Sequence, residues 1–377
     1  MNIGIDARMY GPHVGGGGLG RYVEQLVTEL QAIDTKNRYV LFLKKENFDA
    51  CVITNPNFEK RLADVPWYGL EEQLKMGWIM DREHLDIVHI PHFNVPLFLR
   101  TPFVVTIHDL ILLDEPFSSN ISTRHQTIFR LKYWGYKLVL SHAVSRAKKV
   151  ISISRATKHS ILHHLEGVDP KKIEVVYEGV TPLGTVDLTP RPLLVKERGQ
   201  YLLYVGNAFP HKNLERLLEA FAIVYETHPD VRLVLAGKEN VFYKRLLEHK
   251  TAHVEFVNSP SDAELQQLYA HALLYVYPSR IEGFGLPPLE AMSAGIPVAA
   301  SRIPALEEIL GESVAYFDPN QAEDMAKTLC RLIDSKEERA HLVALGTKQI
   351  QLYSWQKMAK AIQSIYETCG KKSSSNT

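Results

Sequence analysis

Short apolar runs alternate with helical patterns along almost the whole chain, and this alternation restricts its fold more than any other feature. Apolar strands separated by helices are typical of parallel sheets that are covered by helices. In the first half of the chain, strands are expected at residues 2–7, 39–43, 87–90, 103–107, 149–153 and 173–176. In the second half, they are expected at residues 201–205, 232–236, 254–257, 274–277, 298–300 and 315–317.

The pattern lapses between Gly179 and Gln200, where Pro, Gly and Thr accumulate without periodicity and indicate a linker. The chain has 377 residues, which exceeds the ~250–300 at which a single core stops growing. We therefore predict an α/β fold class with two doubly wound domains, at residues 1–180 and 201–355, joined by residues 181–200. Residues 371–377 are expected to be a disordered tail. Ligands of such folds bind at the carboxyl ends of the strands, here in the cleft between the domains.

Several helix starts can be predicted from their side chains. A helix beginning near Leu19 presents its apolar residues on one face. Ser261 with Glu264 is expected to form a capping box, and Asn320 with Glu323 to form a similar pair. Ser154 is expected to cap a helix over Arg155–His164.

Charge and cysteine content exclude several classes of protein. Lys and Arg together number 43, as do Asp and Glu, so the basic surplus of a nucleic-acid-binding protein is missing. The three cysteines, Cys51, Cys330 and Cys369, contain no CxxC pair, which favours a reducing cytoplasm over a disulfide scaffold. No signal peptide or long apolar stretch is present, so we expect a cytoplasmic protein. Because neither a D-x-D motif nor a His/Cys cluster occurs, no metal or other cofactor is expected.

A glycine-rich loop lies between the first expected strand and the first helix. Gly15, Gly17 and Gly20 match G-x-G-x-x-G, which raises the question of a dinucleotide site. The loop begins several residues after the strand, however, and lysines follow residues 39–43 where an acidic residue would hold the ribose. We favour a loop in which Gly17 and Gly18 let the backbone approach an anion or a sugar. The alternative is a loop whose glycines only serve a turn.

Two carboxylates bracket the start of a helix in the second half. Glu282 lies on a Gly-containing loop after an expected strand, and Glu290 lies in the first turns of the helix that follows, so both can face one small ligand. Helix-start N–H groups suit a diphosphate, and a carboxylate can accept two hydrogen bonds from a ribose or sugar diol. The alternative is a solvated loop acid and a glutamate favoured by the helix dipole.

In its Glu-Gly-Phe-Gly-Leu-Pro context, Glu282-x7-Glu290 resembles the E-x7-E signature of family 4 glycosyltransferases. These are retaining enzymes of GT-B fold, in which two Rossmann-like domains face each other across a cleft, and they use nucleotide-sugar donors. The resemblance covers nearly the whole chain, through the glycine loop and the segments 106–109, 151–154, 205–207, 212–213 and 295–298. It also implies that a final helix, at about residues 356–370, packs back onto the first domain.

The resemblance assigns roles to individual residues. Glu290 would hold the donor ribose and Glu282 the transferred sugar, while Lys212, ahead of a helix over residues 213–227, would bind the diphosphate. His108 would contact the donor sugar near the reaction centre, so His108, Glu282 and Lys212 are the expected catalytic residues. The remaining donor-binding residues are expected to be Gly206, Asn207 and the backbone amides of Gly283, Phe284, Gly285 and Leu286.

The chain departs from the family at one point. Many members carry an arginine just after the glycine or just before the lysine, where this chain has Asn207 and His211. Arg280, Asn207 or His211 is therefore left as the second phosphate contact.

The function expected from this resemblance is the transfer of a hexose, with mannose from GDP-mannose favoured, to a glycan or lipid-linked saccharide in polysaccharide biosynthesis. Without a metal, Lys212, neighbouring cations and helix dipoles would stabilise the charge of the diphosphate. The acceptor would attack the sugar from the same face that the diphosphate leaves. Alternatives are transfer from a UDP-sugar such as UDP-glucose, a UDP-sugar 2-epimerase, and a non-catalytic sugar-nucleotide-binding partner.

Residues 116–165 contain no Asp or Glu but many Lys and Arg, with aromatic residues near the middle. A basic, aromatic helix of this kind can lie on an anionic membrane surface, so peripheral contact with the inner membrane face is one interpretation of this stretch. The alternatives are a packing helix with a solvated basic face and a pocket for an acidic acceptor.

Overall fold

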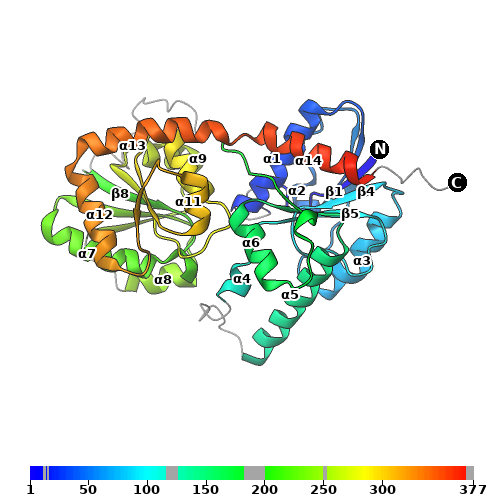
Figure 1. Cartoon of the computed structure of the whole chain (residues 1–377), viewed down its shortest axis with the longest axis horizontal. Coiled ribbons are helices and arrows are strands. Elements are labelled where there is room, and N and C mark those ends of the chain that lie inside the picture. The colour runs from blue at the N-terminus through cyan, green and yellow to red at the C-terminus, as the bar shows by residue number, and fades with distance from the viewer. Residues whose placement is uncertain (12–13, 15–16, 116–125, 182–199, 249–252, 371–377) are drawn as a thin grey trace. The chain divides into compact units, whose positions relative to one another are not determined.

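The computed structural model describes residues 1–11, 14, 17–115, 126–181, 200–248 and 253–370. Gly15 of the glycine loop, residues 116–125 of the basic stretch, the tail at 371–377 and all but the ends of the expected linker lie outside these residues. The described residues form two compact units (Figure 1). The first lies within Met1–Leu110, Ser122–Gly179 and Ser354–Thr377, and the second within Ile111–Ile121 and Val180–Tyr353.

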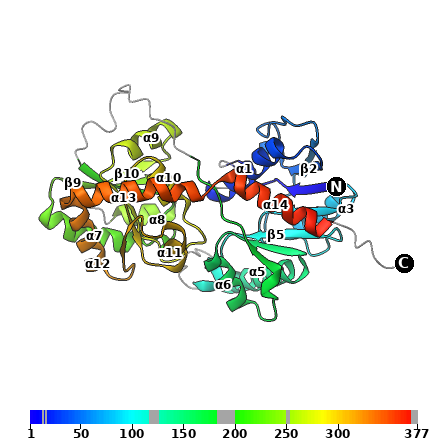
Figure 2. The same ribbon diagram turned by 45° about the horizontal axis from the view of Figure 1, so that its top comes forward.

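The first unit is built on a seven-stranded sheet in the order β3-β2-β1-β4-β5-β6-β7, with every pairing parallel. Its strands are β1 (Asn2–Asp6), β2 (Arg38–Leu43), β3 (Phe58–Leu62), β4 (Ile87–Ile90), β5 (Phe103–Ile107), β6 (Lys149–Ser152) and β7 (Ile173–Val175). Its helices are α1 (Gly17–Ile33), α2 (Lys45–Phe48), α3 (Leu70–Asp81), α5 (Gln126–Arg146), α6 (Arg155–His164), the 3-10 turn η1 (Pro170–Lys172) and α14 (Trp355–Gly370). Figures 1 and 2 show α1 and α14 on one face of this sheet and α3, α5 and α6 on the other.

The second unit is built on a six-stranded parallel sheet in the order β10-β9-β8-β11-β12-β13. Its strands are β8 (Gln200–Val205), β9 (Val231–Gly237), β10 (Val254–Asn258), β11 (Leu274–Tyr277), β12 (Val298–Ser301) and β13 (Ala315–Phe317). Its helices are α4 (Ile111–Asp114), η2 (Pro210–Lys212), α7 (Leu214–Thr227), α8 (Val241–Glu248), α9 (Asp262–His271), α10 (Leu286–Ser293), α11 (Pro304–Leu310), α12 (Ala322–Asp334), α13 (Lys336–Gln349) and η3 (Ile350–Leu352). Helix α12 packs on α7, and α13 packs on α10.

Each strand predicted from the sequence is confirmed to within one residue at either end, and both sheets are doubly wound as expected. Within the described part of the chain, the sequence analysis missed one strand, β3, whose residues Phe-Glu-Lys-Arg-Leu carry three charges in a row. It forms the edge of the sheet, where charged side chains such as Arg61 can remain in water and pair with Glu59 and Glu83. An edge strand therefore needs no continuous apolar run.

Two of the predicted helix caps are confirmed and one is wrong. The Ser154 and Ser261 side chains accept hydrogen bonds from the N–H groups of residues 157 and 264, and Ser261 forms the expected capping box with Glu264. The helix predicted to start at Asn320 begins instead at Ala322, with no side-chain cap. The carboxylate of Asp318 accepts the N–H of Asn320, so this residue is held in a turn before the helix.

A buried chain of hydrogen bonds ties the C-terminal helix to the first sheet. The Tyr366 hydroxyl on α14 lies 2.6 Å from Nδ1 of His89 on β4, and Nε2 of His89 lies 2.8 Å from Oγ1 of Thr106 on β5. Thr106 in turn contacts the Tyr22 hydroxyl of α1 at 3.0 Å. All four side chains are fully buried. Because unpaired buried polar groups are costly, this chain fixes α14, β4, β5 and α1 in one arrangement.

His89 makes the stability of this unit depend on pH. Burial and the nearby His108 lower the pKa of His89 from 6.5 to about 3. Between these values the unfolded chain binds a proton that the folded chain does not, so the stability present above pH 6.5 is lost as the pH falls. We expect the unfolding free energy of the His89→Gln variant to fall less steeply with decreasing pH than that of the unaltered chain. The slopes should differ by about 1.4 kcal/mol per pH unit, as measured by urea unfolding at several pH values. The control His271→Gln, on the surface of the second unit, should leave the slope unchanged, and an unchanged slope for His89→Gln would contradict this assignment.

Candidate active site

The centre of the candidate site is an ion pair between two strand ends of the second unit. Lys212 follows β8 on the turn η2, and its Nζ donates to Oε1 of Glu282 at 2.6 Å and to the Tyr277 hydroxyl at 3.3 Å. Tyr277 ends β11, which pairs directly with β8. From β8 the chain winds toward β10 on one side and then resumes at β11 on the other. The pair therefore lies where the strand order reverses, which is the place where open α/β sheets bind their ligands.

Both members of this pair are mostly removed from water, with 14% and 9% of their side chains exposed. Burial alone would raise the pKa of Glu282, but the ammonium of Lys212 and the hydrogen bonds from Lys212 and Tyr277 hold it below its usual range. Glu282 is therefore a carboxylate at neutral pH. A buried carboxylate whose hydrogen-bond capacity is only partly used can accept further hydrogen bonds from sugar hydroxyls.

His211, the residue before Lys212, is not a second cation. Burial, followed by the neighbouring Lys212 charge, lowers the pKa of His211 to about 4. Its imidazole is consequently neutral at neutral pH, and it can offer a ligand a hydrogen bond but no positive charge.

Asn213 fixes the position of Lys212. It has φ +61°, a left-handed conformation that asparagine tolerates, and it ends the turn η2 just before α7. Its side-chain amide donates to the carbonyl oxygens of Pro278, at 3.0 Å, and Pro319, at 2.7 Å. Three separate segments of the unit are thereby joined beside the ion pair.

Two glycines allow a close approach at the end of β8. A Cβ atom on Gly237 would lie 2.0 Å from the carbonyl oxygen of Gly206, and that oxygen also accepts a hydrogen bond from the Tyr243 hydroxyl at 2.9 Å. Gly206 itself has φ +155°, so the backbone can turn there toward η2. Asn207 is used locally, since its side-chain oxygen accepts the N–H of Phe209.

The loop from Glu282 to Leu286 leads into α10. Gly285 has φ +101° and precedes the helix, and a Cβ there would lie 2.7 Å from Leu306. Between the two carboxylates, Pro287 is half-buried and the other residues are buried, and the Phe284 ring packs edge-on against Tyr353. Glu290, only 9% exposed, lies one turn into α10. The side chains of Phe284 and Leu286 thus belong to the core and do not themselves offer ligand contacts.

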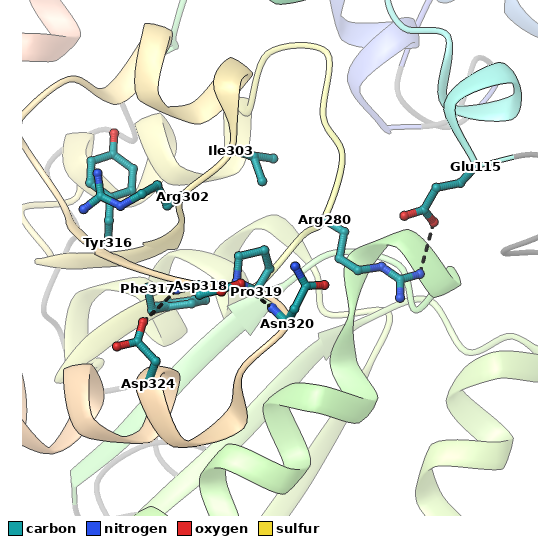
Figure 3. A pocket seen from close by; sticks show the side chains of 10 residues that line it. All are labelled: Glu115, Arg280, Arg302, Ile303, Tyr316, Phe317, Asp318, Pro319, Asn320 and Asp324. Carbon is teal, nitrogen blue, oxygen red and sulfur yellow. Dashed lines mark hydrogen bonds and ion pairs between the residues drawn. The ribbon is translucent and has the colours of Figure 1, made fainter.

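Arg280 lies beside the ion pair and lines a pocket of about 640 Å³ within the second unit. Its backbone N–H donates to the carbonyl oxygen of His211 at 2.8 Å. Figure 3 shows its guanidinium extended toward Glu115, with which it forms an ion pair at 3.1 Å. Among the described residues its Nε is buried and has no hydrogen-bond partner. A buried donor without a partner is the kind of group that a bound anion can satisfy.

The other expected site residues belong to the first unit. His108 follows β5, its Nε2 donates to the carbonyl oxygen of Pro91 at 2.9 Å, and its Nδ1 lies 3.2 Å from Oε1 of Glu178. The Tyr22 ring packs edge-on against it, with ring centres 4.7 Å apart. These contacts fix the orientation of the imidazole. Gly17 and Gly18 form the first turn of α1, where Gly17 has φ +49°.

Glu178, the buried partner of His108, is a residue that the sequence analysis missed. Its position could have identified it as a site residue, since it lies two residues after the expected strand at 173–176. Residues just after the strands of a parallel sheet lie at the ligand-binding edge. Two aromatic residues after β4 were also missed: His92, whose ring centre lies 6.5 Å from that of His108, and Phe93, which packs on His92 at 4.2 Å.

Among the described residues, no group of three or more His, Cys, Asp or Glu side chains could hold a metal ion. In the same part of the chain, no helix combines the length and the apolar character needed to cross a membrane.

Two family models match the chain. Residues 16–182 match "Glycosyltransferase Family 4", and residues 187–349 match "Glycosyl transferases group 1". The O-antigen chain mannosyltransferase RfbU of Salmonella typhimurium is 29% identical over 275 residues, which cover 71% of each chain.

Among solved structures, sucrose-phosphate synthase of Thermosynechococcus elongatus matches with a TM-score of 0.78 and 20% identity, covering 98% of both chains. Anabaena Alr3699/HepE, solved in complex with UDP and glucose, matches with a TM-score of 0.72 and 17% identity, covering 98% of this chain and all of the other. At these identities the two likenesses establish the fold.

The ion pair makes a prediction about stability. Removing one member of a buried pair leaves the other charge unpaired and typically costs about 3–5 kcal/mol. We expect Lys212→Met to lower the free energy of unfolding of the second unit by about 3 kcal/mol, measured by urea unfolding at neutral pH. The double variant Lys212→Met/Glu282→Gln should regain most of that loss, because it buries no unpaired charge. Strictly additive effects of the two substitutions would contradict the coupling.

Proposed function

The chain belongs to glycosyltransferase family 4, and we propose that it transfers mannose from GDP-mannose to a glycan or lipid-linked saccharide. Its two parallel-sheet units are the Rossmann-like domains of the GT-B fold. The observation that carries the proposal is the Lys212–Glu282 ion pair at the point where the strand order reverses. Glu282 also lies eight residues before Glu290 in the sequence. This arrangement offers a cation for a diphosphate and two carboxylates for the hydroxyls of a sugar and a ribose.

The choice of mannose is supported by the similarity to RfbU, which is named a mannosyltransferase. A UDP-sugar such as UDP-glucose is the second candidate donor, because the similar HepE structure contains UDP and glucose. The two donors share the diphosphate and differ in base and sugar, so they would use the same cations.

In the proposed reaction, the bond between C1 of the sugar and the diphosphate oxygen breaks, and a bond from C1 to the acceptor oxygen forms on the same face. The leaving diphosphate takes the proton of the acceptor hydroxyl. Negative charge grows on the diphosphate during this step, and Lys212 meets it at the carboxyl end of β8. The reaction as proposed needs no metal ion, because Lys212, Arg280 and the start of α10 together supply the positive potential.

We assign the second phosphate contact to Arg280. His211 is neutral and the Asn207 side chain is used locally, whereas Arg280 carries a permanent charge and a buried Nε without a partner among the described residues. Its backbone hydrogen bond to His211 keeps it next to the turn that carries Lys212.

A turnover assay tests the proposed donor, the lack of a metal requirement and the role of Glu282 together. We expect GDP release from GDP-mannose in the presence of EDTA and an acceptor, with retained anomeric configuration in the product by NMR. Removing one preorganised electrostatic group typically costs about 10²–10³ in kcat, so Glu282→Gln should lose at least that much. The control Glu337→Gln, at an exposed position on α13, should keep full activity. Turnover of UDP-glucose instead would select the second donor, and an inverted product would refute same-face substitution.

Arg280 is tested by nucleotide binding. A charge-assisted hydrogen bond contributes about 1.5–3 kcal/mol, so we expect Arg280→Gln to weaken GDP binding about 10- to 100-fold in calorimetry. The matched control is Arg302→Gln on the same pocket, where the guanidinium stacks over Tyr316. Equal losses for both variants, or no loss for Arg280→Gln, would show that Arg280 does not contact the phosphates.

A further inference from the structure

Helix α5 of the first unit has two apolar faces. Leu140 and Val144 are buried against the sheet, whereas Leu131, Trp134 and Leu138 are 75%, 68% and 56% exposed. With 3.6 residues per turn, these three exposed side chains lie within about 60° of one another and opposite Leu140. They form a continuous apolar stripe along the outer side of the helix.

Positive charges flank this stripe on both sides. Arg130 and Lys132 are exposed and lie about 100° to either side of Leu131. The ammonium of Lys137 lies 5.8 Å from the centre of the Trp134 ring, and the whole helix sequence contains no Asp or Glu. Cations beside an apolar stripe can bury their stems while their charges reach outward.

Helix α3 repeats the apolar pattern. Leu70, Leu74 and Trp78, spaced by four residues, are each at least 60% exposed, while Met76 and Met80 on the other side are buried. The guanidinium of Arg82 stacks over the Trp78 ring with its carbon 4.5 Å from the ring centre. The one exposed acid in this stretch, Glu71, is paired with Lys75.

The two stripes point in the same direction. Helix α3 leads from β3 to β4 and α5 leads from β5 to β6, and both crossovers advance in the same direction along the sheet. Right-handed crossovers that advance in one direction lie on one face, as Figures 1 and 2 show for α3 and α5. The outer surface of this layer therefore carries six large apolar side chains, which monomeric proteins rarely leave exposed without a function.

We propose that this outer surface of α3 and α5 binds the surface of an anionic lipid bilayer. Two tryptophans and four leucines flanked by Lys and Arg match the composition of helices that lie in the bilayer interface. A second copy of the chain is a poorer occupant, because α5 carries only positive charge and two such faces would repel each other. The proposal rests on the first unit alone and deepens the proposed function by placing a lipid-linked acceptor at the same bilayer.

Flotation of the full-length chain with lipid vesicles tests the proposal. We expect binding to vesicles of phosphatidylcholine with phosphatidylglycerol, weak binding to phosphatidylcholine alone, and release by salt. The variant Leu131→Ser/Trp134→Ser/Leu138→Ser should lose binding to both kinds of vesicle. The variant Arg130→Gln/Lys132→Gln/Lys137→Gln should lose about 100-fold in affinity for the anionic vesicles only, since each cation contributes about 1 kcal/mol.

The matched control is Val241→Ser/Leu352→Ser, which removes two exposed apolar side chains from the second unit and should keep full vesicle binding. Because the altered side chains point outward, all variants should keep their melting temperature and their turnover of a water-soluble acceptor. Equal binding of the Leu131/Trp134/Leu138 variant and the unaltered chain would overturn the proposal. The proposal would also be overturned if the unaltered chain sediments as a dimer and this variant as a monomer, because the surface would then bind a second copy of the chain. If the unaltered chain binds vesicles but does not turn over GDP-mannose, the proposed donor is refuted and the proposed membrane-binding surface is still supported.

Discussion

The buried attraction between Lys212 and Glu282 is the interaction around which the ligand-binding edge of the second unit is organised. Two opposite charges are stable there only because each satisfies the other and Tyr277 adds a hydrogen bond. The cost of removing these groups from water is met when the chain folds and need not be met when a ligand binds. Under the proposed function, a diphosphate would compete with Glu282 for Lys212, and the carboxylate released from that pair would accept hydrogen bonds from the sugar.

The fold could be predicted from the sequence because most of its strands lie inside parallel sheets and are largely apolar. The strand β3 escaped detection because an edge position permits charged residues. The site residues that lie close together along the chain, such as Glu282 and Glu290, could also be predicted from the sequence. Its long-range contacts were not, because Lys212 meets Glu282 across 70 residues and His108 meets Glu178 across a similar span. No local pattern records such a pairing.

Helix α5 illustrates a different limit of sequence reasoning. Its positive charge was evident, and so was its content of apolar and aromatic residues. Leu131, Trp134 and Leu138 are nevertheless as apolar as Leu140 and Val144, so periodicity alone could not tell which face lies against the sheet. Only the packing of the helix on its sheet distinguishes the core face from the outer face.

The hydrogen bond between Tyr366 and His89 joins residues 277 positions apart. The first unit therefore contains chain from before and after the second unit, nearly all of which comes from one continuous stretch ending at Tyr353. During synthesis from the N-terminus, the second unit can complete its core before the last helix has left the ribosome. The first unit, although most of it is translated first, leaves part of its sheet uncovered until α14 has been made. The unit whose sheet is translated first is thus the last to complete its core.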